Sequence, residues 1–130
     1  MTQSDVRNKL ASPYFPFKKT PSSKVDTDDF NKLNIHVFYH DDLHLRGVEV
    51  FSPSEVTFDE ISMLNQPLDK VVSKLRSKGY QVDIDSYGVD CLELGISVSA
   101  PGHMEDSSKL TESIYCQLGQ NQGAKIKDTQ

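Results

Sequence analysis

Three histidines close together in the sequence have the clearest capacity for metal chemistry. His36 and His40 fall on one face of a predicted strand, and His44 follows a turn that contains Asp41 and Asp42. Imidazole nitrogens and carboxylate oxygens are suitable ligands for Zn²⁺ or Ni²⁺. The spacing matches no recognised metal motif, and polar residues are common at hairpin turns. We therefore predict no metal site and no cofactor.

Residues for covalent or acid–base catalysis form no recognisable set. The chain has no Gly-x-Ser-x-Gly elbow and no phosphate-loop or dinucleotide fingerprint. Asp83 and Asp85 share one face of a predicted strand, but such a pair is more typical of a solvated face than of an acid–base couple. The sequence therefore predicts a binding protein and not an enzyme.

Charge is unevenly distributed along the 130 residues, whose formal net charge is −5. Residues 1–24 carry five basic groups and one acid, whereas residues 25–70 carry ten acids and three bases. An acidic surface attracts basic proteins and repels nucleic acid. We expect a basic protein partner and no nucleic-acid partner, the alternative being a solvated face that serves only solubility.

Two cysteines, Cys91 and Cys116, are too few for a disulfide framework. We expect buried thiols, with a cross-strand disulfide as the alternative. The N-terminus lacks a signal-peptide pattern, and no apolar run reaches the roughly 20 residues that span a bilayer. The sequence therefore predicts a cytoplasmic protein without a membrane partner.

Helical periodicity is clearest over residues 67–78. Leu68, Val71, Val72 and Leu75 form an apolar stripe, and Gly79 is suited to end the helix. A shorter helix is expected over residues 4–11, with Ser4 as its N-cap and Pro13 after its end.

Alternating and apolar segments predict strands at 34–40, 45–51, 80–85, 91–99 and 111–118, with a further short strand or two within 56–64. Residues 12–23 hold three prolines and three aromatics, which indicates an extended strap laid over the fold. We predict one α+β domain over residues 1–118, followed by a disordered tail at 119–130. Its mainly antiparallel sheet has about six strands, with helices on one face and the other face open.

The chain also contains a degenerate internal duplication. Ile35 and Ile96 are about 61 residues apart, and Val48 and Ile114 about 66, in segments of similar pattern. These offsets predict pseudo-repeats at about 4–52 and 56–118.

Five phrases of the sequence resemble small bacterial proteins of the immunity type. They are Phe15-Pro16-Phe17-Lys18-Lys19-Thr20-Pro21, Thr27-Asp28-Asp29-Phe30, Ile35-His36-Val37-Phe38-Tyr39, Gly47-Val48-Glu49-Val50-Phe51 and Leu94-Gly95-Ile96-Ser97-Val98. The resemblance is to immunity proteins of polymorphic toxin or contact-dependent growth inhibition systems. The repeated plan is similar to that of beta-lactamase inhibitor proteins. This resemblance implies protein binding and supplies no catalytic residues.

The leading interpretation is a cytoplasmic immunity protein that neutralises a cognate basic toxin domain by occlusion. The candidate partner-binding residues are acids and aromatics: Asp41, Asp42, Glu55, Asp59, Glu60, Tyr39, Phe51, Phe58 and Tyr87. The alternative is a housekeeping domain that binds a small molecule or peptide between sheet and strap. It predicts an apolar pocket near Tyr14, Phe15, Phe17 and His36.

Overall fold

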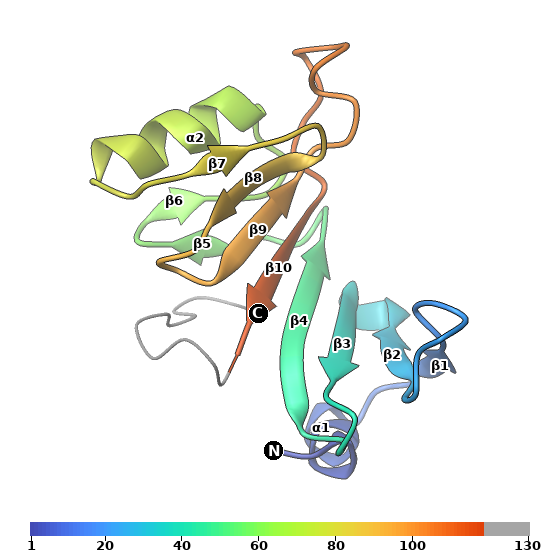
Figure 1. Cartoon of the computed structure of the whole chain (residues 1–130). Coiled ribbons are helices and arrows are strands. Elements are labelled where there is room, and N and C mark those ends of the chain that lie inside the picture. The colour runs from blue at the N-terminus through green and yellow to red at the C-terminus, as the bar shows by residue number, and fades with distance from the viewer. Residues whose placement is uncertain (119–130) are drawn as a thin grey trace.

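The computed structural model describes residues 1–118, so the tail predicted at 119–130 lies outside the described residues. The fold is α+β, with two helices, one large antiparallel sheet and a separate two-stranded sheet (Figure 1). In chain order the elements are α1 (Gln3–Leu10), β1 (Phe15–Phe17), β2 (Thr27–Phe30), η1 (Asn31–Leu33), β3 (Ile35–Tyr39), β4 (Leu45–Phe51), β5 (Thr57–Phe58), β6 (Ile61–Ser62), α2 (Leu68–Ser77), β7 (Asp83–Ile84), β8 (Gly88–Cys91), β9 (Ile96–Ser99) and β10 (Ser113–Gln117).

The large sheet has eight strands in the order β1-β2-β3-β4-β10-β9-β8-β7, not the six expected. Part of the predicted strap pairs as β1 with β2, a strand that the sequence did not suggest. The segment expected as one strand at 91–99 is two strands, because Leu92–Gly95 forms a turn between β8 and β9. Every pair of neighbours is antiparallel.

Both predicted helices are present. α2 buries Leu68, Val71, Val72 and Leu75, as the stripe predicted. α1 begins earlier than expected, because its N-cap is Thr2 and not Ser4. The Thr2 hydroxyl accepts a hydrogen bond from the Asp5 amide while the Asp5 carboxylate accepts one from the Thr2 amide, so each residue satisfies an otherwise unpaired donor.

Strand register assigns the two faces of the sheet, because directly opposed residues of an antiparallel pair point to the same side. One face is apolar and buried, and both helices lie on it: Val6 of α1 and the stripe of α2 belong to the same core cluster. Its strand residues are Ile35, Val37, Val48, Val50, Val89, Cys91, Ile96, Val98, Ile114 and Cys116. We call the opposite face, which neither helix covers, the open face.

The two cysteines are free and buried, which confirms the prediction of buried thiols. Ile96 on β9 is paired with Cys91 on β8 and with Cys116 on β10. The two cysteine backbones are therefore two strand spacings apart, about 10 Å. That separation exceeds the reach of a disulfide. Burial raises the pKa of Cys116 to about 12 and also raises that of Cys91.

A buried ion pair fastens α1 to the sheet. Asp28, fully buried on β2, accepts two hydrogen bonds of 2.8 Å from Arg7 and one of 2.9 Å from the Tyr39 hydroxyl. The Arg7 guanidinium also lies 4.3 Å from the ring centroid of Tyr14 in the strap. These contacts join α1, the strap, β2 and β3 into one unit. No helix within residues 1–118 is long and apolar enough to cross a membrane.

Candidate protein-binding face

A continuous row of opposed side chains crosses the open face from β2 to β8. Its members are Asp29, His36, Glu49, Tyr115, Ser97 and Asp90. All six are partly exposed. The open face is therefore neither a second hydrophobic core nor a fully solvated surface.

Five rings gather on the half of this face formed by β1, β3, β4 and β10, and we call them the aromatic cluster: Phe17, His36, Phe38, Phe51 and Tyr115. The His36 ring lies 4.7 Å from Phe51 and 5.2 Å from Phe17, centroid to centroid. Phe38 lies 5.6 Å from Tyr115. Their edge-on geometries are favourable for aromatic pairs. Phe38 is buried within the cluster, and the other four rings are partly exposed.

Gly47 allows the Tyr115 ring to lie flat on the sheet. A Cβ at Gly47 would overlap the phenol of Tyr115, so the absence of a side chain on β4 creates the space that the ring fills. Gly47 pairs with Phe38 on one side, which brings the Tyr115 and Phe38 rings together. Burial raises the pKa of Tyr115, an effect that the neighbouring Arg46 opposes.

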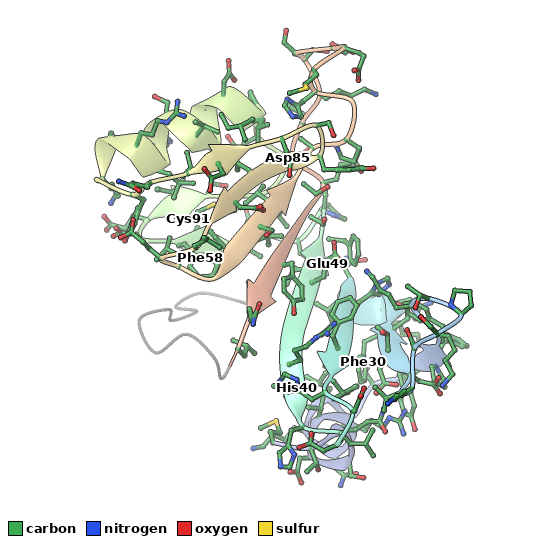
Figure 2. All side chains as sticks on the ribbon, in the orientation of Figure 1. Phe30, His40, Glu49, Phe58, Asp85 and Cys91 are labelled. Carbon is green, nitrogen blue, oxygen red and sulfur yellow. The ribbon has the colours of Figure 1, made fainter. Side chains whose placement is uncertain are left out.

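Carboxylates accompany the rings. Asp29 Oδ1 lies 3.5 Å from His36 Nε2. Glu49, which follows His36 in the row, accepts a 2.8 Å hydrogen bond from the Ser113 hydroxyl. Figure 2 labels Glu49 on β4, near the middle of the sheet. The face thus combines ring surface with negative charge, the chemistry that a cationic side chain recognises.

Two of the predicted anchors, Tyr39 and Phe58, are buried and not on the surface. Tyr39 donates its hydroxyl to Asp28, and burial together with that bond raises its pKa. Phe58 belongs to the core beside α2. Both rings stabilise the fold and leave no surface for a partner.

The other seven predicted residues lie on three separate parts of the surface. Asp41 and Asp42 are exposed in the β3–β4 turn, at the end of the sheet where Figure 2 labels His40. Phe51, Glu55 and Tyr87 lie at or beyond the opposite end, and Tyr87 is 71% exposed. The length of β4 separates those two groups by about 20 Å.

The third group consists of Asp59 and Glu60, in the β5–β6 turn of the smaller sheet. Both lie near Lys78, at 3.4 Å and 3.9 Å respectively. Asp59 also accepts a 3.0 Å hydrogen bond from the Tyr80 hydroxyl. The acidic residues predicted as one surface are therefore not a single patch.

The histidine cluster considered for metal binding is not assembled. His36 points into the aromatic cluster, whereas His44 lies in the turn beside Asp42, 3.2 Å away. Within residues 1–118, no three His, Cys, Asp or Glu side chains are grouped so that they could hold a metal ion.

The sequence-based candidate set did not include Phe17, His36 or Tyr115, three members of the aromatic cluster. The signal was present in the alternation: His36 and Phe38 fall opposite Ile35 and Val37, and Tyr115 falls between Ile114 and Cys116. Alternation does not predict that β4 pairs with β10. That pairing brings the Tyr115 ring of β10 next to the rings of β3 and β4.

Comparison with known proteins identified no relatives: no family model, no curated protein and no solved structure matches this chain.

Proposed function

We propose that this chain is a cytoplasmic immunity protein, which binds a cognate basic toxin domain through the open face and neutralises it by occlusion. The observation that carries the proposal is the aromatic cluster on an uncovered sheet face. Large rings held rigidly by neighbouring rings lose little conformational freedom on binding, and such residues dominate protein–protein affinity.

The dimensions of the face suit a protein. Eight strands span seven spacings, about 34 Å, and five residues of strand add about 17 Å in the other direction. The product, near 600 Å², approaches the roughly 800 Å² that each partner contributes to a standard interface. The loops at one end of the sheet would supply the remaining area: Asp41 and Asp42 lie at one end, Glu55 and Tyr87 at the other.

Charge supports a basic partner. The chain carries a net charge of −5, and Asp29, Glu49 and Asp90 lie in the row that crosses the open face. Toxin domains that act on nucleic acid are basic, so an acidic inhibitor associates with them rapidly through electrostatic steering. Reversing Asp41 and Asp42 to lysine should slow association, and raising the salt concentration should do the same.

We further propose that the two halves of the large sheet are the products of a degenerate duplication. At an offset of 61 residues, β2–β3 and β8–β9 have the same register: Phe30 opposes Ile35, and Cys91 opposes Ile96. Both turns have four residues, and both end in a left-handed conformation, at Asn34 and Gly95.

At an offset of 66 residues, β4 corresponds to β10. Asn34 O accepts a 2.9 Å hydrogen bond from Phe51 N, and Gly95 O accepts one of equal length from Gln117 N. Glu49 and Tyr115 are then equivalent residues, and they oppose each other directly. That arrangement is expected where two copies meet about a local two-fold axis.

The duplication is tested by grafting the sequence of residues 92–95 onto residues 31–34. Equivalent turns should exchange with a loss of no more than about 1 kcal/mol, since glycine suits the left-handed position of Asn34. Deleting Lys32 is the control, because it shortens the turn and should disrupt the β2–β3 register. A graft as destabilising as the deletion would argue against equivalence.

Occlusion by the open face is tested with three tagged baits in the bacterium that encodes the chain: wild type, Tyr115→Ala and Leu92→Ala. Leu92 is a matched control, since it is 75% exposed but lies outside the aromatic cluster. We expect one dominant partner with wild type and Leu92→Ala, and its loss with Tyr115→Ala. Equal capture by all three baits would reject the open face as the interface.

A further inference from the structure

The loop between β1 and β2 folds over a small cavity at the edge of the open face. Residues 18–26 form this loop, which we call the strap loop. Lys18 and Asp26 pair at 3.2 Å across its base, and the hydroxyls of Thr20 and Ser23 lie 3.1 Å apart within it. These contacts connect the two ends of the loop and its middle.

Beneath it lies a cavity of about 260 Å³ between the strap loop and strands β3 and β4. Its lining is polar and cationic: Lys19, Thr20, Ser23, Lys24, Val25, Thr27, Phe38, Tyr39, Asp41 and Arg46. The small-ligand alternative predicted an apolar pocket lined by Tyr14, Phe15, Phe17 and His36, and none of these lines this cavity.

Two of its three cations have no ion pair with any described residue. Lys19 Nζ lies 4.7 Å from the Phe38 ring centroid, and the Arg46 guanidinium carbon lies 6.0 Å from the same centroid. Within residues 1–118, neither forms an ion pair with an acidic side chain. Two positive charges near one neutral ring repel each other. An anion bound between them would reduce that repulsion.

The third cation, Lys24, is only weakly paired. Its ammonium lies 3.9 Å from Asp41 Oδ2, and both side chains are largely exposed. An ion pair of that kind contributes little and exchanges readily for another anion. The cavity thus carries a local charge of opposite sign to the chain as a whole.

We propose that this cavity is a binding site for a small phosphate-bearing molecule. A guanidinium and two ammonium groups match the oxygens of a phosphate, and arginine can donate to two of them at once. The hydroxyls of Thr20, Ser23 and Thr27 can donate further hydrogen bonds. The volume lies below the 300–1,000 Å³ typical of drug-sized ligand sites, which fits a phosphate group with a small remainder.

The cavity adjoins the proposed toxin-binding face, since Phe38 and Asp41 belong to both, but the two proposals concern different ligands. The open face presents rings and carboxylates to a basic partner, whereas this cavity presents cations to an anion. Its test needs no partner protein, so either proposal can fail while the other stands.

The test is titration of the isotopically labelled chain with sodium phosphate, pyrophosphate, acetate or chloride at equal ionic strength, observed by amide chemical shifts. We expect saturable shifts in residues 18–26 and 46 with phosphate and tighter binding of pyrophosphate, but no saturation with chloride. Saturation by acetate at equal concentration would overturn the assignment to phosphate, as would the absence of saturable shifts with phosphate.

Two variants and a control locate the site. Lys19→Gln and Arg46→Gln should each weaken phosphate binding about tenfold or more, the loss expected for one charge-assisted hydrogen bond. Lys70→Gln removes an exposed cation on α2 and should leave binding unchanged. Lys19 lies in a loop, so its replacement leaves the strands intact, and the amide spectrum reports folding directly. Equal affinity in Lys19→Gln, Lys70→Gln and wild type would overturn the proposal.

Discussion

Replacing Arg7 by methionine tests the account of the buried ion pair most sharply. The change leaves the Asp28 carboxylate, fully buried, with only the Tyr39 hydroxyl as a partner. Removing one member of a buried pair costs about 3–5 kcal/mol, since the remaining charge is uncompensated. The Arg7 side chain is 27% exposed, so water can reach the gap, and we expect about 3 kcal/mol.

The assay is urea unfolding followed by circular dichroism. For a small domain, a loss of about 3 kcal/mol lowers the unfolding midpoint by about 1 to 3 M. Lys18→Met is the matched control: it removes an ion pair of 3.2 Å to Asp26, but both side chains are well exposed, so it should cost less than about 1 kcal/mol.

A double variant separates charge from packing. Adding Asp28→Asn to Arg7→Met neutralises the stranded carboxylate while keeping an oxygen that can accept from Tyr39. We expect the double variant to be at least about 1 kcal/mol more stable than Arg7→Met alone. The reasoning is refuted if Arg7→Met costs no more than Lys18→Met, or if the double variant is the less stable of the two.

Two further predictions concern the second half of the sheet. Alanine is strained at Gly79, where φ is 90°, but a Cβ there meets nothing within 4 Å, whereas a Cβ at Gly88 would collide with the Val98 backbone. Gly88→Ala should therefore destabilise the fold by at least about 2 kcal/mol more than Gly79→Ala; equal urea midpoints would contradict this. Because the pKa of the Cys116 thiol is raised from 9.0 to about 12 in the folded state, unfolded chains lose that proton first and stability falls as pH rises above about 9. The slope should be up to about 1.4 kcal/mol per pH unit for that group, and Cys116→Ala should flatten it; an unchanged slope would show that Cys116 does not contribute.

The sequence predicted those elements whose burial follows a simple period. The stripe of Leu68, Val71, Val72 and Leu75 specifies α2, and alternation identifies β4 and β10. It failed for β2, where Asp28 and Asp29 suggest a polar loop. Asp28 is buried only because Arg7, 21 residues away in the chain, supplies a partner, and a local pattern carries no information about such a distant contact.

The same limit explains why several candidate residues lie elsewhere than expected. Tyr39 lies on the same side of its strand as Ile35 and Val37, so its burial could have been expected, but an aromatic residue suits a core and an interface equally well. The predicted strand at 91–99 included Leu92, yet Leu92 is exposed in a turn. Asp41 and Glu60 are close in the sequence, which suggested one acidic surface. The fold places them in different turns, so they do not form one patch.

The most direct test of the central claim, that the open face binds a protein, is hydrogen exchange on the complex of this chain with its captured partner. The account predicts increased protection at edges and loops around the open face, namely residues 15–19, the β3–β4 turn and residues 85–88, with α2 unchanged. Protection confined to α2 and the β5–β6 turn would place the partner on the helical side and contradict the account.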